Sequence, residues 1–207
     1  VILDGAMGTL LQQRGMPPGT VPETLNLTHP QWLLDIHRAY LAAGADIVYA
    51  NTFGASALKL GDCGHTPEEL IAAGVALARR AVAETKPGAL AALDMGPLGQ
   101  LLEPAGTLSF EDAYREFARQ AVAGEAAGAD LAVIETMADL GEARAAVLAV
   151  KENTRLPVLC TMTFEAGGRT FTGCTVSAMA LTLEGLGADA IGFNCSLGPR
   201  DLLPLVE

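Results

Sequence analysis

The chain has 207 residues, half of them apolar and 18% charged, and its formal net charge at pH 7 is −11. This composition indicates a globular domain with a sizeable core, and the acidic balance argues against nucleic acid or anionic lipid as a partner. Apolar stretches are too short to cross a bilayer, and the sequence shows neither a secretory leader nor a disulfide framework among its four cysteines. We therefore expect a cytoplasmic protein with no membrane segment.

Short apolar runs recur along the chain with the length and character of strands buried on both faces of a parallel sheet. In chain order they cover residues 1–3, 47–50, 90–93, 131–134, 157–160 and 190–193. The segments between these runs are amphipathic, which is typical of helices that cover a sheet. The alternation predicts an α/β protein.

Helix boundaries are marked by capping residues and by a repeated tripeptide. Thr66 and Asp139 each lie three residues before a Glu, and Ser109 and Ser177 are expected to cap two further helices. Gly-Ala-Asp stands just before three of the expected strands, where the glycine supplies the left-handed residue that ends a helix. The three copies cover residues 44–46, 128–130 and 187–189.

Six strands that alternate with helices fit either a (β/α)8 TIM barrel or an open doubly wound sheet. No glycine-rich phosphate fingerprint follows the first strand, so the barrel is favoured. Because a complete barrel takes about 250 residues, we expect residues 1–207 to be one barrel domain that lacks its C-terminal part and contains about the first six βα units.

Polar residues follow nearly every expected strand, and in a barrel these positions share the face that carries active sites. Asp4 and Glu135 come directly after apolar runs, where a buried carboxylate needs a cation or hydrogen-bond donors. Together they are candidates to hold an ammonium group. The backbone N–H groups of Gly5 and Ala6 are candidates for binding a small carboxylate. An amino acid clamped in this way would direct its side chain toward Cys195.

Cys195 follows the last apolar run and is a candidate metal ligand or nucleophile, although one thiolate cannot complete a metal site. Structural interpretations remain open for the other strand-end residues. Asp4 can accept hydrogen bonds from the turn that follows it. Asn194 can satisfy backbone groups, and Thr52 and Phe53 can form the wall of a pocket.

Several of these segments together resemble the zinc-dependent homocysteine S-methyltransferases. The matching segments, in the family's order, are Asp4-Gly5-Ala6-Met7-Gly8-Thr9, Asn51-Thr52-Phe53, Glu135-Thr136-Met137 and Gly192-Phe193-Asn194-Cys195-Ser196-Leu197-Gly198-Pro199. The last segment and Gly168-Arg169-Thr170-Phe171-Thr172-Gly173 are most similar to the cobalamin-dependent methionine synthase branch. Separate motifs in register make the resemblance specific.

The resemblance implies a methyltransferase in which zinc activates the thiol of homocysteine for attack on a methyl donor. Cys195 matches the first of three zinc-binding cysteines, and the other two are expected beyond Glu207. The implied donor is methylcobalamin on a separate domain, with a methyltetrahydrofolate-binding domain in the same polypeptide. The implied homocysteine-binding residues are Asp4, Gly5, Ala6, Thr52, Phe53, Glu135 and Asn194. We expect the isolated chain to hold zinc weakly and to be inactive.

Two other functions remain open. One is a stand-alone homocysteine S-methyltransferase that takes its methyl group from S-methylmethionine or S-adenosylmethionine. The other is a metal-free module that binds an amino acid without catalysis.

Overall fold

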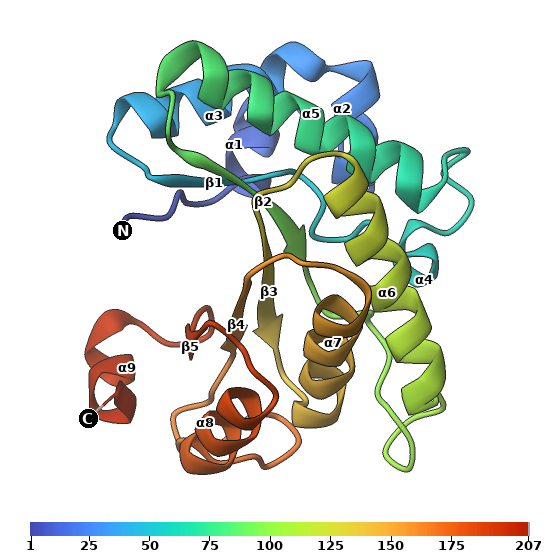
Figure 1. Ribbon diagram of the computed structural model, residues 1–207, viewed down its shortest axis with the longest axis vertical. Helices are drawn as coiled ribbons and strands as arrows, with labels where there is room; N and C mark the ends of the chain where they lie inside the picture. The colour runs from blue at the N-terminus through green and yellow to red at the C-terminus, as the bar shows by residue number, and fades with distance from the viewer. Residues whose placement is uncertain (207) are drawn as a thin grey trace.

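A computed structural model describes residues 1–206 and contains a five-stranded, fully parallel sheet (Figure 1). The strands are β1 (Ile47–Tyr49), β2 (Leu90–Met95), β3 (Leu131–Met137), β4 (Val158–Met162) and β5 (Ala190–Phe193). Their order in the sheet is their order in the chain. A doubly wound sheet reverses its strand order at a switch point, whereas a barrel does not. The architecture therefore confirms the α/β prediction and its barrel form.

The expected strand at residues 1–3 is reduced to one bridge. Leu3 pairs with Ile47 in parallel, and the N–H of Asp4 donates to the Ile47 carbonyl at 3.0 Å. Val1 and Ile2 are 97% and 63% exposed, so no second strand within residues 1–206 covers their other side. The remaining backbone contacts of this segment go to Asp46, whose N–H donates to the Ile2 carbonyl and whose carboxylate accepts from the Ile2 N–H.

The helices form an arc outside the strands, from α3 and α5 at the top of Figure 1 through α6 to α7 and α8 at the bottom. The long helices are α3 (Pro30–Ala42), α5 (Pro67–Thr85), α6 (Phe110–Ala126), α7 (Leu140–Asn153) and α8 (Val176–Gly185). The short elements are α1 (Gly8–Gln13), the 3-10 helix η1 (Pro22–Thr24), α2 (Leu25–Thr28), α4 (Ala57–Leu60) and α9 (Pro199–Val206). No helix within residues 1–206 combines the length and apolar character that a bilayer span requires.

The capping residues explain where the long helices begin. Thr66 forms a complete capping box with Glu69, and the Ser109 hydroxyl accepts from the N–H of Asp112, as predicted. Asp139 caps α7 through the N–H of Gly141. The predicted cap at Ser177 is wrong, because Thr175 takes that role at the start of α8.

The Gly-Ala-Asp repeat ends three helices and also ties neighbouring strands together. Its glycines have φ of 113°, 89° and 82°, as a helix-ending residue requires. Each aspartate forms two hydrogen bonds at 2.7–2.9 Å with the backbone of one residue. Its N–H donates to that residue's carbonyl, and its carboxylate accepts from the same residue's N–H. The partner lies on the preceding strand for Asp130 and Asp189, and in the N-terminal segment for Asp46. The pairs are Asp46 with Ile2, Asp130 with Ala91 and Asp189 with Val158. The repeat therefore fixes strand register at the amino ends of the strands, opposite the candidate site.

Apolar side chains cover both faces of the sheet. On the inner face a small cluster is formed by Ile47, Ala92, Leu131 and Val133. The larger core lies between sheet and helices, where α6 approaches β2 closely at Gly124. A side-chain carbon at Gly124 would lie 2.5 Å from Leu93, so glycine allows this spacing.

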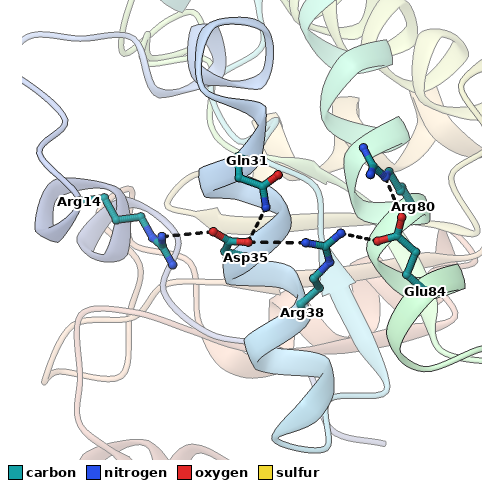
Figure 2. A network of polar contacts seen from close by, with 6 residues as sticks. All are labelled: Arg14, Gln31, Asp35, Arg38, Arg80 and Glu84. Atoms are coloured by element: carbon teal, nitrogen blue, oxygen red, sulfur yellow. Dashed lines mark hydrogen bonds and ion pairs between the residues drawn. The ribbon is translucent and has the colours of Figure 1, made fainter.

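A surface network of six residues joins α1 and the two helices beside it (Figure 2). Its members are Arg14, Gln31, Asp35, Arg38, Arg80 and Glu84. Asp35 accepts from Gln31 at 2.6 Å and lies 3.7 Å from Arg14, and Arg38 links Asp35 to Glu84. Exposed ion pairs contribute little to stability individually, and α1 also buries Leu11 against Leu25, Leu33 and Ile36.

Candidate functional site

The carboxyl ends of the strands surround a cavity of about 580 Å³. Seven of the residues singled out from the sequence line it: Asp4, Gly5, Ala6, Phe53, Glu135, Asn194 and Cys195. They come from the loop after residue 3 and from the ends of β1, β3 and β5. The parallel sheet thus brings together residues that are up to 191 positions apart in the chain.

Asp4 presents a largely buried carboxylate to the cavity. Its Oδ2 accepts from the N–H of Tyr49 on β1 at 3.0 Å, and its buried Oδ1 has no hydrogen-bond partner among residues 1–206. Burial above all, with a smaller contribution from the charge of Glu135, raises the pKa of Asp4 to about 7 against the lowering effect of the hydrogen bond from Tyr49. A carboxylate in this state binds a cation that supplies both charge and donors.

Two more carboxyl groups face the same space. Asp94, at the end of β2, is only 8% exposed, and its Oδ1 also lacks a partner within the described residues. Burial, followed by the charges of Glu135, Asp4 and Glu23, holds the pKa of Asp94 well above its usual value. Burial also raises the pKa of Glu135. Asp94 follows an apolar run just as Glu135 does, and this signal identifies it in the sequence.

Glu23 is a fourth carboxyl group, and it comes from η1 rather than from a strand. It is 4% exposed, and its Oε1 accepts from the N–H of Gly54 at 2.6 Å. Burial raises the pKa of Glu23, whereas Lys59 lowers it. The Lys59 ammonium lies 4.6 Å from the centre of the Phe53 ring. No pattern in the loop at residues 14–24 distinguishes Glu23 from an ordinary surface glutamate.

The four carboxyl groups make the cavity attractive to a positive charge. No lysine or arginine is among the residues that line it in the described part of the chain. Because neighbouring carboxylates repel each other when all are ionised, an ammonium group among them would relieve that repulsion.

Gly5 and Ala6 offer backbone donors at the rim. Neither N–H has a hydrogen-bond partner within residues 1–206, and both residues are exposed. Tyr40 holds the loop by donating its hydroxyl to the Ala6 carbonyl at 2.9 Å. A side-chain carbon at Gly5 would lie 3.0 Å from that hydroxyl, so the small residue permits the contact. Free N–H groups on a fixed loop suit a small anion.

Thr52 lies outside the cavity lining. Its side chain is fully buried, and its hydroxyl donates to the Asp94 carbonyl at 2.8 Å and accepts from the Asp94 N–H at 3.0 Å. Thr52 therefore joins the ends of β1 and β2 beneath the site.

Cys195 is exposed at the cavity, beside the end of β3. Its Sγ lies 3.8 Å from the hydroxyl of Thr136 and 3.6 Å from Nδ2 of Asn194. Thr136, Cys195 and Ser196 have φ of 62°, 59° and 59°, which is rare for residues with a side chain and concentrates at functional sites.

The fit to a metal ion is incomplete. Within residues 1–206, no group of three histidine, cysteine or acidic side chains is arranged to hold one. Cys195 alone lines the cavity among the cysteines, and Cys160 is fully buried on β4, where burial raises its pKa to about 12. A catalytic zinc ion takes three protein ligands. The described residues therefore do not form a zinc site by themselves.

Comparison with known proteins places this chain in a family. The model of the homocysteine S-methyltransferase family matches residues 1–207. The chain belongs to this family. It is 36% identical over 220 residues to the methionine synthase of Mycobacterium leprae and 36% identical over 222 residues to that of Mycobacterium tuberculosis. Each alignment covers 96% of this chain but only 18% of the relative, so the chain spans about a fifth of their length.

Solved structures of the homocysteine methyltransferase MmuM from Escherichia coli have the same fold. The metallated form superposes with a TM-score of 0.84 and the apo form with 0.75, each at 23% identity. Both matches cover 98% of this chain, with 76% of the metallated and 74% of the apo chain. This similarity confirms the TIM-barrel class.

Proposed function

We propose that this chain is the homocysteine-binding barrel of a cobalamin-dependent methionine synthase. The observation that carries the proposal is the cavity in which buried carboxyl groups face an exposed thiol. Such a cavity suits an amino acid that has an ammonium group at one end and a sulfur atom at the other. Family membership and the identity to two methionine synthases support the choice of homocysteine.

In this proposal, Asp4 and Glu135 bind the ammonium group of homocysteine. Asp94 lies in the same acidic group and contributes to the field that favours a cation. Because the pKa of Asp4 is about 7, an incoming ammonium group readily shifts its carboxyl group to the deprotonated, charged form. The N–H groups of Gly5 and Ala6 bind the carboxylate of the substrate, and Phe53 packs beside its methylene groups.

The sulfur end of the substrate is directed toward Cys195. We propose that Cys195 is one zinc ligand and that two further cysteines outside residues 1–207 complete the set. Zinc held in this way would keep the homocysteine thiol deprotonated, which a free thiol with a pKa of about 8.5 is not at neutral pH. The chain of residues 1–207 alone is then expected to lack methyl transfer.

We propose that the methyl donor is methylcobalamin carried by another domain of the same polypeptide, with a methyltetrahydrofolate-binding domain beside it. The supporting fact is length, because the matching methionine synthases are more than five times as long as the aligned region. The barrel mouth then has to admit a large cofactor domain.

Methyl transfer to homocysteine tests the proposal. In the natural full-length polypeptide, the Cys195→Ser variant is expected to lose transfer from methylcobalamin, whereas Cys63→Ser is the matched control and retains it. Cys63 lies in the loop at residues 61–65, and it is not among the cavity-lining residues. Undiminished transfer in Cys195→Ser would remove the thiol from the mechanism.

A second candidate is a stand-alone methyltransferase that uses S-methylmethionine or S-adenosylmethionine. The fold similarity to MmuM, of which the match covers 76%, favours it. Assays with the three donors separate the candidates, because the main proposal expects turnover with methylcobalamin and none with either sulfonium donor.

A further inference from the structure

The side chain of Asn194 is fully occupied by contacts within the protein. Its Oδ1 accepts from the Thr136 N–H and from the Thr161 hydroxyl, each at 2.9 Å. Its Nδ2 donates to the Thr136 hydroxyl at 2.7 Å and reaches Oε2 of Glu135 at 3.3 Å and Sγ of Cys195 at 3.6 Å. A side-chain amide offers two acceptor lone pairs and two donor hydrogens. Asn194 therefore has no free hydrogen-bonding group for a ligand.

The backbone of Asn194 is held as firmly as its side chain. Its N–H donates to the Met162 carbonyl at 3.3 Å, and its carbonyl accepts from the Thr163 hydroxyl at 2.8 Å. Asn194 is thus attached to the last residue of β4 and to Thr163, which directly follows it, and β4 lies between β3 and β5 in the sheet. The asparagine forms a rigid connection across three strands.

Thr136 is the other half of this connection. It has φ of 62°, a conformation that disfavours a β-branched residue, and it carries two of the hydrogen bonds to Asn194. Glu135 directly precedes Thr136, and Cys195 directly follows Asn194. The two strained turns are therefore locked to each other with the carboxyl group on one side and the thiol on the other.

We propose that Asn194 and Thr136 are positioning residues that fix the separation between the Glu135 carboxylate and the Cys195 thiol, and so set the length of amino-acid thiol that the cavity accepts. The proposal rests on the proposed function, in which these two groups mark the ammonium and sulfur ends of homocysteine. It assigns Asn194 a structural contact with the site instead of the substrate contact expected from the sequence.

The physical consequence is selectivity between thiols that differ by one methylene group. Cysteine is one methylene shorter than homocysteine, so it cannot reach both ends of a cavity whose ends are held apart. Discrimination of one methylene is typically worth about 10-fold to 200-fold. A cavity whose ends move independently can adapt to cysteine, and its selectivity falls.

A matched pair of variants tests this in the natural full-length, zinc-loaded polypeptide. Thr136→Ser and Thr136→Ala both remove the γ-methyl group, and only the serine keeps the hydroxyl that accepts from Asn194. The measurement is the ratio of the cysteine Kd to the homocysteine Kd from titration calorimetry. We expect Thr136→Ser to keep the wild-type ratio and Thr136→Ala to lower it by roughly tenfold, through tighter cysteine and weaker homocysteine binding.

A second variant covers the case in which Thr136→Ala does not fold. Thr161→Val removes the hydroxyl that donates to Asn194 and keeps the shape of the side chain, so a smaller fall in the ratio is expected. The positioning role is overturned if Thr136→Ala and Thr161→Val, or whichever of them folds, keep the wild-type ratio. The proposed function still stands in that case. If wild-type protein does not bind homocysteine, the proposed function fails and this inference fails with it.

Discussion

The Asp4 carboxylate is expected to reduce the stability of the ligand-free protein above neutral pH. Its pKa is about 7 in the folded chain, against an ordinary value of 3.8. Between these values the folded state binds more protons than the unfolded state, so the contribution of Asp4 to stability falls as pH rises from about 4 to 7. Asp4→Asn removes this titration, and its amide oxygen can still accept from the Tyr49 N–H.

The size of the effect follows from the pKa. A difference of about three units at about 1.4 kcal/mol per unit gives at most about 4 kcal/mol at pH 8. At pH 5, which is only about one unit above the pKa of this aspartate in the unfolded chain, the same linkage gives about 1.5 kcal/mol. Asp4→Asn is therefore expected to be more stable than wild type, with an advantage that grows by about 2 to 3 kcal/mol between pH 5 and pH 8.

Urea unfolding of the chain at the two pH values measures this advantage, followed by the fluorescence of Trp32, the single tryptophan. Asp62→Asn is the matched control, because Asp62 is exposed and has no hydrogen-bond partner among residues 1–206. Removing this exposed carboxylate should not reproduce the growing advantage of Asp4→Asn. An Asp4→Asn advantage that is absent, or equal at both pH values, would refute the burial argument for this carboxylate. Asp4→Asn should also bind homocysteine more weakly than wild type. This result would show that the buried carboxylate lowers stability in favour of function.

Three further predictions concern other buried residues. His37 is fully buried, and neither ring nitrogen has a partner in the described chain. Burial lowers its pKa to about 4, so the protein should lose stability as the pH falls from 6.5 to 4. In urea unfolding, His37→Phe should reduce that loss by up to about 3 kcal/mol. A side-chain carbon at Gly96 would lie 2.5 Å from the Phe53 ring. Gly96→Ala should therefore lower the free energy of unfolding by about 1 to 3 kcal/mol and weaken homocysteine binding in calorimetry. The control is Gly185→Ala, where nothing lies within 4 Å of the added carbon, and it should not weaken binding. Thr52→Val leaves the backbone of Asp94 without its partner, so thermal and urea unfolding should report a loss of about 1 to 3 kcal/mol in the free energy of unfolding. A change in homocysteine affinity with no change in stability would contradict the structural role of Thr52.

The strand and helix pattern could be predicted because each buried strand is a short apolar run and each helix carries its own boundary signal. Residues 131–134 show the first kind of signal, and Thr66 and Gly128 show the second. The strand at residues 1–3 failed because a strand depends on its neighbours as well as on its composition. Ser177 failed because Thr175, two residues earlier, has an equally suitable hydroxyl and the extended backbone of a cap.

The site was predictable where a polar residue follows an apolar run, as at Asp4, Glu135 and Cys195. This signal also covers Asp94, whose burial beside other carboxyl groups appears only in three dimensions. It cannot identify Glu23, which enters the cavity from a loop. Nor can it tell which way a strand-end side chain points, and the structure shows that the polar atoms of Thr52 and Asn194 bond within the protein.

The most direct test of the central claim is calorimetric titration of homocysteine into the natural full-length polypeptide, with and without zinc, in wild type and in Cys195→Ser. The proposed function predicts binding that requires zinc and is lost in Cys195→Ser. Homocysteine binding that is equal in all four titrations would contradict it and would favour a metal-free amino-acid-binding module.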